Sequence, residues 1–258
     1  MKKAIMVTLL SSAALMLVAT PANAAEKETK TDVGVSFISD DPTVEAEDMR
    51  PFKNNLAVVF KPSSFQFGNQ KAVGGIAMFA NTTGDNGGTI GNKPTTDKSQ
   101  YIVVNDDRDY TQQGVDGKNS PWTLKANLSE LKTSDGAATL QSAKITMALN
   151  EPKLYNIGAA LNEDETDFIG NKPWEEGALE ALPNDTGVVA ASTVTLEAGG
   201  TTKADIFTKK DANTFRKGVS SVIQNVKLNI VDSDQQNLGG KSFTGKVHWT
   251  LNDAPVFN

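Results

Sequence analysis

The chain has 258 residues, a formal net charge of −6 at pH 7 and no cysteine. A chain of this length can bury a core large enough to fold without disulfide bridges, and its acidic excess argues against nucleic acid as a partner. The absence of cysteine also excludes a disulfide framework and a lipid-modified N-terminal cysteine.

The first 24 residues have the three regions of a secretory signal peptide. Lys2 and Lys3 supply the charge, an apolar run extends over residues 4–19, and Ala22-Asn23-Ala24 offers the small residues of a cleavage site. The apolar run is short for a membrane span, which takes about 20 residues. We therefore expect secretion without membrane insertion. Cleavage after Ala24 removes both lysines, which changes the formal net charge from −6 to −8.

The segment that follows, residues 25–50, is acidic and polar. Its one alternating apolar patch consists of Val33, Val35 and Phe37. This composition predicts a partly ordered N-terminal leader. One further domain is expected over residues 51–258, because single all-β domains often run to about 200 to 250 residues.

Short apolar or alternating runs, separated by clusters of Gly, Asn, Asp and Pro, fill the chain from residue 51 onward. Such runs are typical of strands joined by turn-rich loops. The expected strands are Leu56–Phe60, Phe65–Phe67, Ile76–Ala80, Tyr101–Val104, Trp122–Leu128, Leu140–Leu149, Val188–Leu196, Val222–Ile230 and Phe243–Leu251. They predict an all-β fold, with a single β-sandwich-like or barrel-like antiparallel domain and long loops.

A Trp-Thr-Leu tripeptide occurs twice within the expected strands. Because side chains alternate along a strand, Trp and Leu of each copy share one face and Thr lies on the opposite face. The two copies consist of Trp122, Thr123, Leu124, Trp249, Thr250 and Leu251.

The residues around both copies resemble the WxL-domain cell-surface proteins of low-GC Gram-positive bacteria. The resemblance is carried by "PSSFQFGNQ" at 62–70, by "YIVVNDDRDYTQQG" at 101–114 running into "SPWTLKANLSEL" at 120–131, and by "LGGKSFTGKVHWTLNDAP" at 238–255. It covers roughly residues 51–258. It implies a surface protein held non-covalently at the cell wall by binding peptidoglycan, and assembly with other WxL-domain proteins and a membrane-anchored partner. The stretch from Phe168 to Gly187 has no counterpart in the family pattern.

Two interpretations of Trp122 and Trp249 remain open at this stage. An indole can stack on a sugar ring and donate one hydrogen bond, whereas a Trp on the inward row of an alternating strand is usually buried. If the two strands are neighbours, they build either a binding platform or the core beneath it. Trp174, in an acidic loop, is a second candidate platform, or it folds back onto its own surface.

No residue pattern points to a catalytic centre, a cofactor or a metal site. His248 is the only histidine, so a zinc site with nitrogen and sulfur ligands is excluded. The acidic clusters at 105–109, 162–167 and 232–237 lack EF-hand spacing, and no nucleophile elbow is present. Asp107 and Arg108 are expected to make structural hydrogen bonds or an ion pair beside the first Trp strand.

The stretch "LPNDTG" at residues 182–187 is similar to a covalent wall-sorting signal, but it has one residue too many and no apolar tail follows it. Attachment is therefore expected to be non-covalent. The sequence predicts a non-catalytic, secreted protein of the Gram-positive cell surface that binds peptidoglycan. The alternative is a protein-interaction module or adhesin that docks other secreted surface proteins or host matrix.

Overall fold

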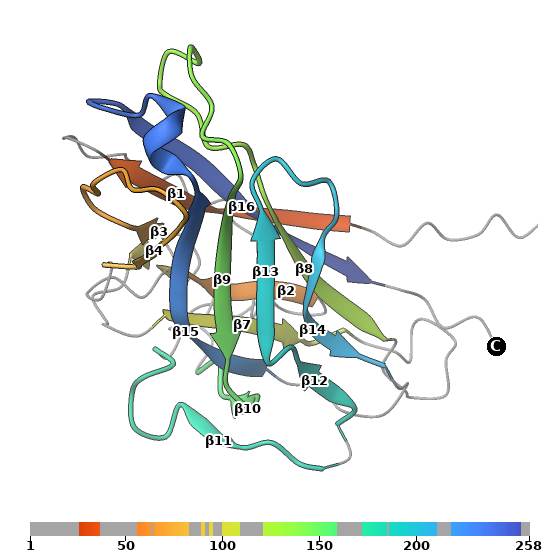
Figure 1. The fold of residues 1–258 in the computed structure, drawn as a ribbon. Coiled ribbons are helices and arrows are strands. Elements are labelled where there is room, and N and C mark those ends of the chain that lie inside the picture. The colour runs from red at the N-terminus through yellow and green to blue at the C-terminus, as the bar shows by residue number, and fades with distance from the viewer. Residues whose placement is uncertain are drawn as a thin grey trace, which may run out of the picture.

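The computed structural model describes residues 26–36, 56–62, 64–82, 89–90, 93–94, 100–108, 121–158, 172–184, 186–210 and 218–253. In these ranges the chain forms two β-sheets packed as a sandwich, with one short 3₁₀ turn at Ser233–Gln236 (Figure 1). The all-β, sandwich-like fold expected from the sequence is confirmed. No helix of the described ranges has the length and hydropathy needed to cross a bilayer.

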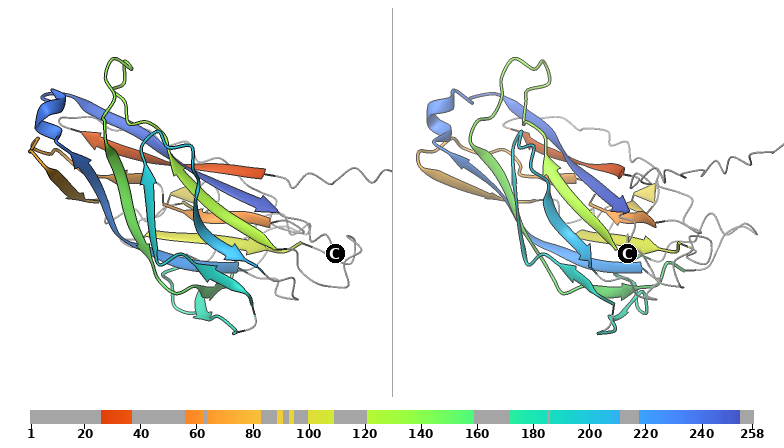
Figure 2. Two further views of the ribbon diagram at one scale, coloured as in Figure 1. Left: turned by 45° about the vertical axis from the view of Figure 1, so that its right-hand side comes forward. Right: turned by 90° about the vertical axis from the view of Figure 1, so that its right-hand side faces the viewer.

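The first sheet has six strands, and the two strands that carry the repeated tripeptide are neighbours at its centre (Figure 2). All its pairings are antiparallel except that of β1 with β3. In spatial order the strands are β12 (Val188–Ala190), β14 (Ala204–Lys209), β8 (Trp122–Leu128), β16 (Ser242–Asp253), β1 (Glu26–Ser36) and β3 (Ser64–Gln66).

The second sheet has ten strands, and the long strand β15 (Gly218–Val231) organises it. Its register shifts between Gln224 and Lys227, where Asn225 takes the left-handed conformation that Asn tolerates. β15 pairs with β7 and β10 before the shift and with β4 after it, and β9 pairs with β15 on both sides of the shift. Its other strands are β2 (Leu56–Lys61), β4 (Ile76–Ala80), β5 (Thr89–Ile90), β6 (Lys93–Pro94), β7 (Gln100–Asp106), β9 (Ala143–Leu149), β10 (Lys153–Tyr155), β11 (Leu179–Ala181) and β13 (Thr193–Glu197).

The main core fills the space between the two sheets. Strands β8 and β9 each direct one face into this core: every second residue in both is buried, and the residues between are half-buried. Burial of each large apolar side chain contributes about 1.5 to 3 kcal/mol, so these two strands alone account for a large part of the cohesion between the sheets.

A second, smaller apolar cluster lies on the opposite face of the ten-stranded sheet. Strands β2 and β7 are buried at every residue, because they pack against the main core on one face and this cluster on the other. A register irregularity between Val58 and Phe60 turns Val59 and Phe60 to the outer side. The segment that contains Trp174 and Leu179 packs against this cluster and forms a partial third layer.

The prediction of one strand over Val188–Leu196 is wrong, because the chain changes sheets within it. Strand β12 pairs with β14 of the first sheet, and β13 pairs with β9 of the second. Ala191 still donates its N–H to Ile206, whereas the Ser192 carbonyl accepts from Leu149. Ser192 and Thr193 are both exposed at the crossing, but the buried residues on either side, Val188 and Val194, are an even number of residues apart, so the period of two does not reveal the change of sheet.

Part of the segment expected as a leader forms a full strand of the first sheet. All eleven residues of β1 pair with β16, from Glu26 opposite Asn252 to Ser36 opposite Ser242. The expected signal peptide lies outside the described residues. Strands β10, β11 and β14 were also not expected from the sequence, because β10 and β11 have three residues each and β14 carries charged residues at two of its six positions.

We expect Gly245→Ala to destabilise the domain by about 1 to 3 kcal/mol, because the new methyl group has no space. Its Cβ would lie 2.7 Å from Leu131 Cδ2 and 3.0 Å from the Glu130 carbonyl oxygen. Gly239→Ala is the matched control: its Cβ would meet nothing within 4 Å, and we expect a change within about 0.5 kcal/mol. Urea unfolding measures both, and equal midpoints for the two variants would contradict the expectation.

Candidate functional site

The two Trp-Thr-Leu copies lie side by side and run in opposite directions. Leu124 of β8 is paired with Leu251 of β16, and the two tryptophans flank this leucine pair from opposite ends. Trp249 lies opposite Ala126, a small residue that leaves room for the indole beside it. The repeat in the sequence is therefore a local twofold arrangement in the sheet, centred on the two leucines.

Both indoles of the repeat point into the main core. Trp122 is 1% exposed and Trp249 is 0% exposed, and both leucines are fully buried. Trp122 packs edge-on against Phe207 of β14, with ring centroids 6.4 Å apart and an interplanar angle of 86°. Neither ring presents a face to solvent, so a sugar ring cannot stack on either of them in this structure.

Trp249 is fixed by a buried chain of hydrogen bonds. Its indole Nε1–H donates to the Thr31 hydroxyl of β1 at 2.5 Å, and that hydroxyl donates to the Pro62 carbonyl at 2.7 Å. Pro62 follows β2, a strand of the ten-stranded sheet. These hydrogen bonds therefore join β16 and β1 of the six-stranded sheet to the backbone that follows β2 of the ten-stranded sheet. A buried network of hydrogen bonds stabilises the fold only when every polar group in it has its partner.

Trp122 differs in this respect. Its Nε1–H is buried and has no hydrogen-bond partner among the described residues. A buried donor without a partner costs about 1 to 3 kcal/mol relative to one that is paired. The two indoles therefore fill equivalent places in the repeat but contribute unequally to stability.

The two threonines of the repeat lie on the outer face of the sheet. Thr123 is half-buried, whereas Thr250 is fully buried, and its hydroxyl has no partner among the residues the structure describes. Thr250 is paired with Lys125, whose ammonium lies 2.8 Å from an Asp205 carboxylate oxygen on β14. This face is polar and has no aromatic ring at these positions.

Trp174 is half-buried and packs against the other sheet, in the largely exposed segment before β11. Its ring centroid is 5.6 Å from Phe60 at 73° and 6.1 Å from Tyr101 at 37°, and Lys172 Nζ is 6.0 Å from the ring. Tyr155 belongs to the same cluster; burial raises the pKa of its hydroxyl, with a further contribution from the Glu175 charge. Trp174 is thus the one partly exposed tryptophan, held in place by two rings behind it.

The polar residues expected near the first Trp strand take structural positions. Arg108 forms a two-point ion pair with Asp106, with Nε to Oδ1 and Nη2 to Oδ2 both 2.8 Å, and both side chains are buried. Asp107 is half-buried beside them, and His248 is half-buried on the outer face of β16. Within the described ranges, no group of three or more His, Asp or Glu residues could hold a metal ion.

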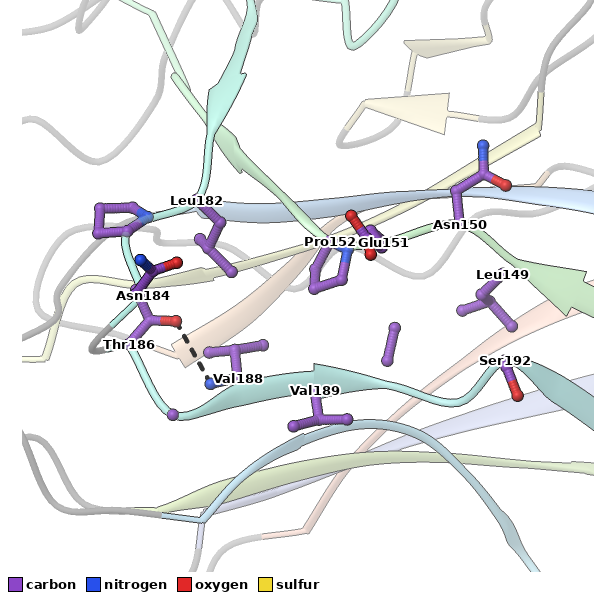
Figure 3. Close-up of a pocket in the computed structure, with 13 residues that line it drawn as sticks. Leu149, Asn150, Glu151, Pro152, Leu182, Asn184, Thr186, Val188, Val189 and Ser192 are labelled. Atoms are coloured by element: carbon purple, nitrogen blue, oxygen red, sulfur yellow. Dashed lines mark hydrogen bonds between the residues drawn. The ribbon is translucent and has the colours of Figure 1, made fainter.

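A groove of about 480 Å³ lies where the edge strand β12 faces the turn between β9 and β10 (Figure 3). Sequence reasoning missed this groove as a site, although five of its lining residues belong to the "LPNDTG" stretch. Its walls come from segments that are about 30 residues apart in sequence, so only the fold brings them together. The lining residues are Leu149, Asn150, Glu151, Pro152, Leu182, Pro183, Asn184, Thr186, Gly187, Val188, Val189, Ala190 and Ser192.

A protein-family model described as "WxL domain surface cell wall-binding" matches residues 22–255. The chain belongs to this family. Membership places this WxL protein at the Gram-positive cell surface, bound non-covalently to the cell wall, and the family description names no reaction. No curated protein and no solved structure matches the chain. The tripeptide that gives the family its name occupies the two central strands of the six-stranded sheet.

Trp249→Phe is expected to destabilise the WxL domain more than Trp122→Phe, by about 1 to 2 kcal/mol. Both changes remove the same atoms from the core, but only Trp249 donates a hydrogen bond to a described residue. Urea unfolding of both variants measures the difference. Equal losses of stability would show that the bond to Thr31 contributes nothing.

Proposed function

We propose that this WxL domain attaches to the cell wall by binding peptidoglycan, without catalysing a reaction, and that Trp174 contacts the glycan. The observation that carries the proposal is the contrast among the three tryptophans of the chain. Trp122 and Trp249 are buried in the core, whereas Trp174 is half-buried at the surface and backed by two aromatic rings.

The physical basis for this role is stacking. The apolar face of a sugar ring packs on an indole face, and an aromatic side chain that is already held in place loses little conformational entropy on binding. Trp174 meets this condition, because Phe60 and Tyr101 hold its ring before any ligand arrives. Binding by contact alone needs no catalytic residue, cofactor or metal.

Replacing Trp174 with Ala is expected to weaken binding to peptidoglycan about tenfold, because it removes the stacking surface. The measurement is sedimentation of the mature protein with purified sacculi stripped of teichoic acid and protein. Met78→Ala is the control, since Met78 is a 63% exposed apolar side chain on β4 and is not part of the aromatic cluster.

The same assay separates binding from stability when Trp122→Ala and Trp249→Ala are included. We expect these variants to lose binding only in proportion to the loss of folded protein, as followed by circular dichroism. Full binding by a folded Trp174→Ala protein would overturn the role of Trp174. A failure of the native protein to sediment would overturn peptidoglycan as the ligand.

Salt is expected to leave wall binding unchanged or to strengthen it. The mature chain is expected to be acidic, and Gram-positive walls that retain their polymers are anionic, so the long-range force between them is repulsive and is screened by salt. Sedimentation with such walls at low and moderate ionic strength tests this. Release of the protein between these two conditions would contradict a binding mode based on short-range contacts.

A second candidate function, docking of another surface protein, is supported by the edge strand β4. Ile76 is 73% exposed and Met78 is 63% exposed, and Val73 and Val231 lie at the same edge. Other WxL-domain proteins or a membrane-anchored partner are the expected occupants. If this patch carries the attachment, Met78→Asp abolishes sedimentation with protein-bearing walls, and protein-free sacculi leave even the native domain in solution.

A further inference from the structure

Strand β12 has a free backbone edge that faces the groove. It is the terminal strand of the six-stranded sheet and pairs only with β14 among the described strands. Ala191 donates its N–H to Ile206, and Gly187 accepts from Lys210, so the hydrogen bonds to β14 fall on residues 187, 189 and 191. The N–H and C=O groups of Val188 and Ala190 therefore point away from β14, toward the groove side.

The described residues make only one long contact with the backbone groups of this edge. The Val188 N–H reaches the Thr186 hydroxyl at 3.4 Å, beyond the usual range of a hydrogen bond of this kind (Figure 3). Among the described residues, no hydrogen-bond partner is recorded on this side for the Ala190 N–H or for the carbonyls of Val188 and Ala190, so these groups can pair with an added strand. An extended peptide that lies along such an edge gains main-chain hydrogen bonds, and alternate side chains enter the neighbouring pocket.

The side chains of the groove walls provide an apolar surface and one carboxylate. Leu149, Leu182 and Val188 form an apolar base, and Pro152 flanks it. Glu151 is exposed on the opposite wall and makes no ion pair with any described residue. A carboxylate beside apolar surface and free backbone groups suits an extended peptide that carries an amine.

We propose that this groove binds the peptide stem of peptidoglycan, extended alongside β12, with the free amine of the stem at Glu151. The inference rests on the proposed function, because it assumes that peptidoglycan is the ligand, and it assigns the peptide to a site separate from Trp174. The lining residues include no aromatic ring, so the groove lacks the stacking surface that a glycan needs, whereas its backbone edge matches a peptide.

The dimensions agree with this assignment. The volume of about 480 Å³ falls within the range of small-ligand sites. Strand β12 has three residues and spans about 10 Å, which accommodates a short peptide rather than a long polymer. Trp174 and β12 both lie on residues 172–190 of the chain, and the groove lining does not include Trp174.

The test is calorimetric titration of the mature protein with peptide stems released from sacculi by an amidase, and separately with the glycan strands left behind. Two variants probe the groove. Glu151→Gln removes the charge and keeps the shape, with Glu180→Gln as the matched control, because Glu180 is an exposed carboxylate on β11 that does not line the groove. Ala190→Pro removes the free N–H without removing a bond to β14, and proline is tolerated on edge strands.

We expect the free stems to bind the native protein and the Glu180→Gln control equally. Glu151→Gln is expected to weaken the binding of the stems about fivefold, and Ala190→Pro about tenfold. Binding of the glycan strands is expected to depend on Trp174 and not on either groove variant. If Ala190→Pro fails to fold by circular dichroism, the comparison of Glu151→Gln with Glu180→Gln still decides the outcome.

Two results would overturn the inference: no heat of binding with the free stems, or equal affinity of the native and both folded variant proteins. If the native protein sediments with intact sacculi but does not bind free stems, the groove assignment fails and peptidoglycan binding stands. If it neither sediments with sacculi nor binds glycan strands or stems, the proposed function itself fails.

Discussion

The antiparallel pairing of β8 with β16 is the constraint on which the rest of the fold depends. It sets the two leucines of the repeated tripeptide against each other and places both indoles in the core. The chain of hydrogen bonds from Trp249 through Thr31 to Pro62 then fixes β1 beside β16 and ties it to the backbone after β2. A slip of β16 by one residue in this pairing would turn Trp249 and Leu251 to the opposite face and break that chain.

The tryptophans and leucines of the tripeptides are part of the core, so the contacts that we propose with the wall lie on other surfaces. Glu151 of the groove lies on the turn between β9 and β10, whereas Trp174 and β12 both lie on residues 172–190. This segment is anchored at Trp174 on the second apolar cluster and at β12 on the first sheet.

Side-chain alternation made most of the long strands predictable, including both copies of the tripeptide, since it reports burial on one face. It could not show that Val188–Leu196 spans two sheets, because the buried positions on both sides of the crossing have the same phase. Nor could it decide whether the tryptophans form a core or a platform, which depends on what packs over each face. The groove was beyond prediction, since Glu151 and Val188 meet only through the tertiary fold.

The pairing of β1 with β16 joins the two ends of the described chain, with more than 200 residues between them. Contacts this distant in sequence form late, because the long intervening loop must first be ordered. A chain that emerges from a secretion channel N-terminus first therefore carries β1 without its partner until residue 253 has followed. Because β16 pairs with both β1 and β8, the six-stranded sheet is completed only after β16 itself has left the channel.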